Sequence, residues 1–462
     1  MLKQKLIGDR AFYRRVLAVA IPIIIQNFIT NFVSLLDNIM VGQVGTAEMS
    51  GVAIVNQLLF VFNLCIFGAV SGAGIFTAQF YGCRDHEGIR RTFRFKIYAA
   101  LVLSAIGISI FLLAGNPLIH LYLNGEGSVQ DAELTLQHGL SYMKIMLWGL
   151  LPFALANGYC STLRETGQTF IPMVAGVTAV IVNLVLNFVL IFGHLGLPAM
   201  GVRGAAIATV ISRYVELAIV AFWAHTHKNK NPYISGLYRS GYIPVNLLKQ
   251  ILLCGTPLMF NEVLWGMGMA TLGQCYSTRG LDVVAAVNIS STIYNLGAVI
   301  FLSMGSVMSI LMGQLLGSNA PEHTVRDNFR KIVALSVGSC VVLGILLALS
   351  SRLFPQIYNT TDSVRSIATG LICICACFMP FNAYVHGVYF ALRSGGKTVI
   401  TFIFDSGFMW LLNVPLAFCL SRFTNIPIFP LYALCQATDL IKCVLGTILI
   451  RGKAWMQNLT NL

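Results

Sequence analysis

Residues 332–350 read IVALSVGSCVVLGILLALS, a run with no charged side chain. A helix needs about 20 apolar residues to cross the roughly 30 Å of hydrocarbon in a bilayer, so this run is almost a complete transmembrane helix. Runs of this kind recur along the whole chain, and none shows the alternating polarity that is typical of a transmembrane β-barrel. We predict twelve transmembrane helices, at residues 16–41, 52–80, 95–115, 138–161, 170–193, 203–225, 247–277, 283–314, 331–350, 366–391, 399–420 and 430–450.

The composition also indicates a membrane protein. Of the 462 residues, 56% are hydrophobic and only 10% are charged, whereas about a quarter of a soluble chain is charged. The first apolar run begins near Val16 and is too long for a signal peptide, so we predict that it is retained as a helix. The 12 cysteines lie mostly within the predicted helices, where buried and inert thiols are the better interpretation than a metal site.

The charged residues sort by side of the membrane. If the N-terminus lies on the first side, 23 of the 30 Lys and Arg residues fall on that side and 5 on the other, and Lys144 and Arg213 fall inside predicted helices. Lys96 and Lys442 are counted on the first side, although they fall within the predicted helices 95–115 and 430–450. This asymmetry is the positive-inside bias, so both termini are predicted to be cytoplasmic. The net charge of +13 is therefore explained by topology and contact with anionic lipid, not by nucleic-acid binding.

The sequence contains an internal repeat. A shift of 235 positions, which drifts to about 229 farther along, aligns residues of the first half with identical residues of the second. The aligned pairs include Pro22 and Pro257, Gly45 and Gly280, Gln79 and Gln314, Gly82 and Gly317, Leu163-Arg164 and Leu392-Arg393, and Asn183 and Asn413.

Each repeat carries six predicted helices, an even number, so both enter the membrane from the same side. We predict two lobes, residues 1–225 and 247–462, related by a pseudo-twofold axis along the membrane normal and joined by a cytoplasmic linker at 226–246. Two such bundles form a cavity near the midplane, and their rocking alternates access to it. This architecture favours a carrier over a membrane enzyme.

Five acidic residues fall inside predicted helices, where an ionisable side chain costs roughly 2.5–3.5 kcal/mol. They are Asp37, Glu216, Glu262, Asp405 and Asp439. Glu216 follows Arg213 by three residues and Asp439 precedes Lys442 by three, a spacing that predicts an ion pair on one helix face.

Asp37, Glu262 and Asp405 have no basic residue three or four positions away. A carboxylate in a low-dielectric cavity binds protons more tightly, and together with neighbouring oxygens it can hold Na⁺. We therefore predict that these three residues couple transport to a cation. The alternative for Asp37 is a structural role at the end of its helix.

Amide side chains supply further candidates. Asn183 and Asn187 are four residues apart, which places both on one helix face, and their carbonyl oxygens could help Asp37 hold a cation. The alternative is that they only bridge helices. Weaker candidates for the wall of a substrate cavity are Gln26, Asn56, Asn157, Asn261, Tyr294 and Asn413.

Several of these segments resemble one transporter family. DNIMVGQVGTAEMSGVAIVNQ from Asp37, LRETGQTFIPM from Leu163 with its echo LRSGGKT from Leu392, and NLVLNFVLIFGHLGLPAMGVRGAAIATVISR from Asn183 resemble segments of the multidrug and toxic compound extrusion (MATE) transporters. The likeness covers nearly the whole chain in order. It implies two six-helix lobes around a central cavity.

The resemblance also implies roles for individual residues. Asp37 matches the acidic residue of the family's first helix, Asn183 its helix-five asparagine, and Glu262 its helix-seven glutamate. Asn187 stands where some members carry an aspartate. The aspartate that some members carry in helix ten is missing here, and we expect Asp405 in helix eleven to substitute for it.

The function that the resemblance implies is export of cationic or amphipathic organic compounds, driven by inward Na⁺ or H⁺. It further implies a monomer in the cell membrane with no cofactor besides the coupling ion.

Two rival classes of transporter remain. A major facilitator transporter is disfavoured because the loop GCRDHEGIRR from Gly82 has the wrong spacing. A lipid-linked sugar flippase of the same superfold should line its cavity with many basic residues. The sequence contains no cluster of His residues and no Gly-x-Ser-x-Gly elbow, so neither motif points to an enzyme.

Overall fold

The computed structural model describes residues 6–42, 44–123, 129–358 and 360–460, and within these ranges every regular element is helical. Twelve of the described helical stretches are long and apolar enough to cross a membrane. Each of them overlaps one of the twelve predicted spans. The predicted all-α membrane architecture is therefore confirmed.

The α-helices follow one another along the chain, and four of the described spans are interrupted or preceded by short 3₁₀ or π turns. In chain order the elements are α2 (Arg10–Gly42), α3 (Thr46–Gly82), α4 (His86–Leu123), α5 (Val129–Met146), η1 (Leu147–Gly149), α6 (Leu150–Glu165), α7 (Phe170–Phe192), α8 (Val202–Thr226), η2 (Pro232–Ile234), α9 (Val245–Ser277), α10 (Leu281–Gly317), α11 (Glu322–Ser350), η3 (Phe354–Ile357), α12 (Asp362–Ser394), α13 (Thr398–Phe402), η4 (Ile403–Gly407), η5 (Met409–Asn413), α14 (Val414–Phe423) and α15 (Ile428–Arg451).

The chain divides into two compact units. Unit 1 comprises Met1–Ile24, Ala78–Arg84 and Thr256–Leu462, and unit 2 comprises Ile25–Thr77 and Asp85–Gly255. The boundaries between these units pass through α2, α3 and α9. The lobes predicted at 1–225 and 247–462 are instead a division by sequence repeat, and that division stays a prediction.

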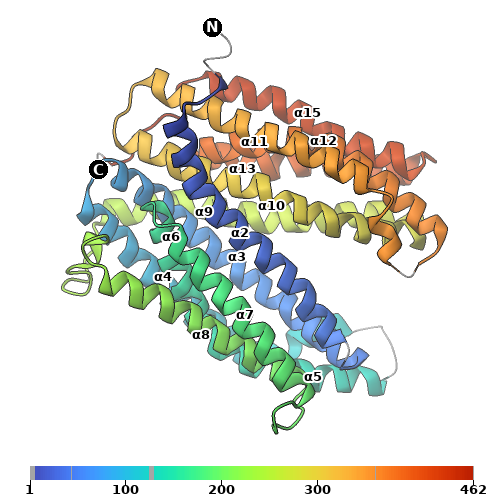
Figure 1. Cartoon of the computed structure of the whole chain (residues 1–462). Helices are drawn as coiled ribbons and strands as arrows, with labels where there is room; N and C mark the ends of the chain where they lie inside the picture. The colour runs from blue at the N-terminus through green and yellow to red at the C-terminus, as the bar shows by residue number, and fades with distance from the viewer. Residues whose placement is uncertain (1–5, 43, 124–128, 359, 461–462) are drawn as a thin grey trace. The chain divides into compact units, whose positions relative to one another are not determined.

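In unit 2, α8 packs against α5, α6 and α7, and α4 packs against α6 (Figure 1). The core of this unit is aliphatic and includes Val55, Ile66, Ile119 and Leu150, each no more than 1% exposed. The helix α7 ends at Gly193, whose φ of 76° lies in the left-handed region that favours glycine. Buried apolar faces and a defined helix end together fix the positions of the α7 side chains.

In unit 1, α12 packs against α10, α11 and α15 (Figure 1). The ends of α3 and α10 meet in a reciprocal contact: a Cβ atom added at Gly82 would overlap the carbonyl of Gln314, and one added at Gly317 would overlap the carbonyl of Gln79. These four residues are two of the pairs that the sequence repeat aligns. The repeat therefore recurs in the structure as a glycine-mediated helix contact.

The linker between α8 and α9 is tied to α4. Arg94, which is buried, donates hydrogen bonds from its guanidinium to the carbonyls of Leu237 at 2.9 Å, Gly236 at 3.0 Å and Tyr242 at 3.2 Å. Arg90 and Tyr98 of α4 also donate to its carbonyls, at Tyr233 and Gly241, so the polar segment predicted at 226–246 is anchored to unit 2 by side chains that satisfy its backbone.

Candidate cation-coupling site

Polar and charged side chains from four elements of unit 1 meet around Asn261 of α9. The Asn261 amide donates to Asp405 Oδ2 at 3.1 Å and to the Tyr389 hydroxyl at 3.3 Å. Its carbonyl oxygen accepts from the backbone N–H and the hydroxyl of Ser406, at 3.2 and 2.8 Å. Asn261 is only 1% exposed, so its hydrogen bonds join α9, α12 and η4 inside the helix bundle.

A basic residue pairs with Asp405. Lys442 Nζ of α15 lies 3.0 Å from Asp405 Oδ1 and 5.4 Å from the centre of the Phe408 ring. The sequence analysis counted Lys442 with the residues of the first side and paired it with Asp439 on the same helix. That pairing is corrected: Lys442 is buried and reaches across to the neighbouring helix, because sequence spacing identifies partners on one helix only.

Glu262 of α9 is half-buried, and no hydrogen bond or ion pair within 4.0 Å joins it to the part of the chain that the structure describes. Arg393 of α12 and Asp405 are the charged groups that act on it. Arg393 also interacts with the Tyr389 hydroxyl and lies over the Phe390 ring at 5.4 Å. Asp439 of α15 belongs to the same electrostatic group through Lys442 and Asp405. Three carboxyl groups, two basic groups and the His386 imidazole of α12 therefore share one region.

Asp405 lies in an unusual stretch of backbone. The span between Thr398 and Phe423 contains two successive π-helical turns, Ile403–Gly407 and Met409–Asn413. Pro415 follows directly, and a proline can neither donate its backbone hydrogen bond nor tolerate the carbonyl four residues earlier. Trp410 Nε1 donates to the Leu264 carbonyl at 2.9 Å and, with Ser406, ties this stretch to α9. π turns in helices occur frequently at functional sites.

The predicted amide pair forms in unit 2. The Asn187 amide donates to Asn183 Oδ1 at 3.1 Å, and Asn183 donates to the Thr209 hydroxyl of α8 at 3.3 Å. Both asparagines are buried. The side chain of Asp37 lies outside the described part of the structure, so the cation site predicted around Asp37, Asn183 and Asn187 stays a prediction.

The two acidic positions are not equivalent under the repeat. With the shift of 235, Asp37 aligns with Leu272, and Glu262 aligns with Asn27. Each half therefore carries its lone carboxylate on its first helix, but at a different depth along that helix. The arginines aligned by the repeat differ as well: Arg164 donates to Gln26 at 2.7 Å, whereas Arg393 acts on Glu262.

The remaining cavity candidates occupy varied environments. Gln26 is buried against Arg164, and Asn56 is exposed and accepts from the Tyr142 hydroxyl at 3.2 Å. Asn157 donates to the Phe153 carbonyl of its own helix. Tyr294 lies beside Phe301, with 6.3 Å between ring centres, and Asn413 ends η5. Of the six, Asn261 alone joins the acidic cluster of unit 1, and their assignment to a substrate cavity stays a prediction.

The predicted pairing of Arg213 with Glu216 is not among the ion pairs of the described residues. Arg213 instead donates to the Gly149 carbonyl at 3.2 Å and lies over the Phe153 ring at 4.8 Å. Glu216 accepts a long contact of 3.9 Å from Cys160 Sγ. The three-residue spacing predicted that both side chains lie on one face of the helix. In the structure, each has its nearest polar partner on a neighbouring element instead.

Sequence reasoning missed a buried ion pair in unit 2. Lys96 Nζ of α4 lies 2.5 Å from Glu165 Oε2 of α6, and the Lys96 side chain is 0% exposed. It also donates to the hydroxyls of Ser161 at 3.0 Å and Thr162 at 3.1 Å. Lys96 and Glu165 lie at or just beyond the ends of predicted helices, next to polar segments, so the sequence suggests that they are loop residues. Nothing in the sequence shows that α4 and α6 are neighbours.

The model of the MatE family matches two segments of the chain, residues 22–189 and 257–419. The two segments begin at Pro22 and Pro257, the first aligned pair of the internal repeat. Together they cover most of the chain, including Asp37, Asn183, Glu262 and Asp405.

Curated relatives and solved structures agree with this match. The chain is 24% identical over 412 residues to a probable multidrug resistance protein NorM of Thermotoga maritima, covering 89% of this chain and 86% of that one. It is 22% identical to the probable multidrug resistance protein YoeA of Bacillus subtilis, covering 88% and 87%.

Among solved structures, an outward-facing multidrug resistance MATE transporter of the MOP superfamily superposes with a TM-score of 0.86 at 19% identity, covering 97% of both chains. A variant of the Vibrio cholerae MATE transporter VcmN gives 0.86 at 17% identity, covering 97% of this chain and 99% of that one. At these identities the likeness shows the fold.

Proposed function

This chain belongs to the MatE family of multidrug efflux transporters, and we propose that it exports cationic or amphipathic organic compounds by antiport with a cation bound at Glu262. One observation carries the proposal: Glu262 is half-buried in a membrane-spanning helix without an ion-pair partner within 4.0 Å among the described residues. Such a carboxylate persists in a low-dielectric region when binding a positive charge is part of its function.

The charges around Glu262 support coupling to a single positive charge. With these groups ionised and the neighbouring His386 imidazole neutral, the carboxylates of Glu262, Asp405 and Asp439 exceed the bases Arg393 and Lys442 by one negative charge. Binding of one cation at Glu262 brings the cluster to neutrality, which is favourable where the dielectric constant is low. Release of that cation restores the net charge, so the occupied and empty states differ in energy, as coupling requires.

A proton suits this cluster better than Na⁺. Na⁺ needs several oxygen ligands around it, but both oxygens of Asp405 already accept hydrogen bonds, from Asn261 and from Lys442. A proton needs only one carboxyl oxygen, which Glu262 supplies by itself. We therefore propose H⁺ as the ion at Glu262, with Asn261, Asp405 and Lys442 as positioning residues.

The basic residues of the described helices do not favour the flippase alternative. From the sequence, only Lys144 and Arg213 were assigned to the interior of spans. In the structure, Lys96, Arg164, Arg393 and Lys442 are also buried or hydrogen-bonded within the helix bundles. Lys96 and Lys442 are paired with acids, and Arg164 donates to Gln26. Side chains engaged within the bundle are poor candidates for binding a pyrophosphate.

Transport by the purified protein in liposomes tests the proposal. A pH gradient and then a Na⁺ gradient are imposed, and efflux of a fluorescent organic cation is followed. We expect the pH gradient to drive efflux and Glu262→Gln to reduce that efflux by about tenfold or more, because the amide cannot take up the proton. Asp362→Asn, which removes a carboxylate that is 98% exposed, is the matched control and should transport normally.

Each outcome separates one part of the proposal. Efflux driven only by Na⁺ would make the choice of H⁺ wrong, while antiport would stand. Normal transport by Glu262→Gln would show that the coupling site lies elsewhere, with the region of Asp37 as the next candidate. If neither gradient drives efflux, antiport itself is wrong.

The remaining properties follow from this function. We propose that the chain acts as a monomer in the cell membrane with both termini cytoplasmic, as the distribution of its Lys and Arg residues indicates. Its substrates would be small organic cations or amphipathic drugs. It requires no cofactor besides the coupling ion, and it contacts lipid but not nucleic acid.

A further inference from the structure

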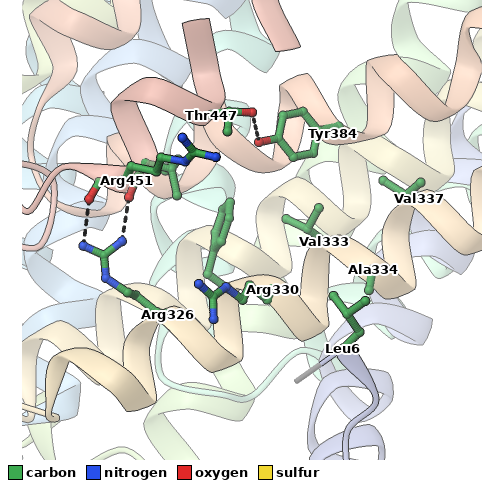
Figure 2. A pocket seen from close by; sticks show the side chains of 11 residues that line it. Leu6, Arg326, Arg330, Val333, Ala334, Val337, Tyr384, Thr447 and Arg451 are labelled. Atoms are coloured by element: carbon green, nitrogen blue, oxygen red, sulfur yellow. Dashed lines mark hydrogen bonds between the residues drawn. The ribbon is translucent and has the colours of Figure 1, made fainter. Parts of the chain in front are cut away.

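A cavity of about 380 Å³ opens on unit 1 between α11, α12 and α15, and Leu6, which precedes α2, borders its apolar part (Figure 2). Figure 2 shows that its two ends differ in character: Arg326, Arg330 and Arg451 lie at one end, and Val333, Ala334 and Val337 lie toward the other. We call this cavity the α11–α15 groove. None of the residues of the candidate coupling site lines it.

The basic end of the groove lies on the side that the charge distribution predicts to be cytoplasmic. Arg326 and Arg330 fall in the first turns of α11, and Arg451 is the last residue of α15. Arginines at the cytoplasmic end of a membrane-spanning helix lie at the level of the phosphate groups of the inner leaflet. The other end of the groove extends along α11 into the span.

The three arginines have different tasks. Arg326 is engaged within the protein, because its Nε lies 2.8 Å from Glu322 Oε1 and its Nη atoms donate to the carbonyls of Ile450 and Arg451 at 3.0 Å each (Figure 2). These bonds fix the end of α15 against α11. Arg326 therefore shapes the groove but has little capacity left for a ligand.

Arg330 and Arg451 are available to a ligand. Arg330 has only a long contact of 3.7 Å with Asp327, and its side chain is 47% exposed. Arg451 is exposed, and no ion pair joins it to the described residues. Two neighbouring guanidinium groups with free N–H donors match the geometry of a phosphate group.

From its basic end to its apolar end, the groove is about as long as one leaflet of the hydrocarbon core. From Arg326 to Val337 the helix advances eleven residues, about 16 Å at 1.5 Å per residue. Half of the roughly 30 Å hydrocarbon core is about 15 Å. The polar groups deeper in the groove satisfy one another, since the hydroxyls of Tyr384 and Thr447 lie 2.7 Å apart (Figure 2). The inner part of the groove therefore suits a hydrocarbon chain.

We propose that the α11–α15 groove binds one anionic phospholipid of the cytoplasmic leaflet. The phosphate lies between Arg330 and Arg451, and one acyl chain lies along α11 against Val333, Ala334 and Val337. A zwitterionic lipid binds less well because its positive headgroup charge opposes the arginines. A cationic drug is disfavoured for the same reason, so the groove is distinct from the proposed transport site.

Native mass spectrometry of the purified full-length protein tests this. The protein is titrated with phosphatidylglycerol and, separately, with phosphatidylcholine of the same acyl chains. We expect one tight phosphatidylglycerol adduct whose dissociation constant is about tenfold lower than that of phosphatidylcholine. The double variant Arg330→Gln with Arg451→Gln should raise the phosphatidylglycerol constant by about tenfold or more, because it removes two charge-assisted contacts.

Two further variants keep the result interpretable. Lys228→Gln with Lys230→Gln removes two exposed positive charges from the linker, away from the groove, and should leave lipid binding unchanged. Ala334→Phe keeps both arginines but fills the apolar part, so it should lose the tight adduct if an acyl chain lies there. It also provides an independent test if the double arginine variant fails to fold.

The opposite results would overturn the proposal. Equal affinity for the two lipids would show that the arginines do not select a phosphate. Equal loss in the linker control would show that only net charge matters. An unchanged adduct in Ala334→Phe would exclude the groove as the acyl-chain site, and displacement of the lipid by a cationic drug at equal affinity would make it a drug site instead.

Discussion

Two buried ion pairs show how single residues are accommodated in the helix bundles. Lys96 with Glu165 in unit 2 and Lys442 with Asp405 in unit 1 each join neighbouring helices. Lys96 also donates to the hydroxyls of Ser161 and Thr162, and Asp405 also accepts from the Asn261 amide. A buried pair of this kind adds little net stability compared with an apolar pair, but removing one partner leaves a buried charge unpaired. Its main effect is to specify which helix faces meet.

At the residue scale, we predict that Lys442→Met destabilises the protein by about 3 kcal/mol, because Asp405 is left without its cation. The double variant Lys442→Met with Asp405→Asn should recover most of that loss. Chemical denaturation in detergent micelles measures the difference. Equal destabilisation by the single and the double variant would show that the two residues do not act as a pair.

An exposed pair supplies the control for this cycle. Arg365 and Asp362 lie 3.1 Å apart at the start of α12, with side chains 35% and 98% exposed. Replacing Arg365 by Gln should change stability by less than about 1 kcal/mol, since water screens an exposed pair.

At the scale of the helix, close packing depends on glycines at particular crossings. Gly82 of α3 lies against the Gln314 carbonyl of α10, and Gly317 of α10 lies against the Gln79 carbonyl of α3, so a side chain at either position would overlap a backbone carbonyl. Backbone atoms cannot move aside as a flexible side chain can. By contrast, Gly338 of α11 has nothing within 4 Å of an added Cβ.

We therefore predict opposite effects for two alanine substitutions. Gly317→Ala should lower stability by about 1–3 kcal/mol, because it forces α3 and α10 apart. Gly338→Ala should be neutral or raise stability by up to about 1 kcal/mol, because alanine favours the helix. Thermal unfolding of both variants in the same detergent checks the prediction, which fails if Gly317→Ala melts at the same temperature as the original protein.

At the scale of the whole molecule, the arrangement of twelve spans fixes which loops face which side. An even number of spans places both termini on one side, and the basic residues predict that this side is cytoplasmic. The segment between α7 and α8 then faces outward, where Leu195 is 88% exposed, and the linker that contains Lys228 faces the cytoplasm.

Cysteine labelling tests this topology. In intact cells, a membrane-impermeant maleimide should label Leu195→Cys but not Lys228→Cys, in a background where the exposed Cys83, Cys377 and Cys419 are replaced by serine. After lysis both variants should react, which shows that each site is accessible. Labelling of Lys228→Cys in intact cells would show that the orientation is opposite to the predicted one.

The sequence by itself determined the membrane class, the twelve spans, the internal repeat and the amide pair Asn183–Asn187. These features depend on local properties: runs of apolar residues about 20 long, identities at a constant shift, and side chains one helix turn apart. It also identified Glu262 as a carboxylate without a neighbouring cation on its own helix.

Only the tertiary structure decided which helices are neighbours. The sequence predicted Asp439 as the partner of Lys442, but the packing of the helices makes Asp405 its partner. The same packing forms the pair Lys96–Glu165 and places the π-helical turns beside Asn261. The physical reason is that spacing along a chain describes the faces of one helix, whereas ion pairs and hydrogen bonds between helices depend on how those faces pack.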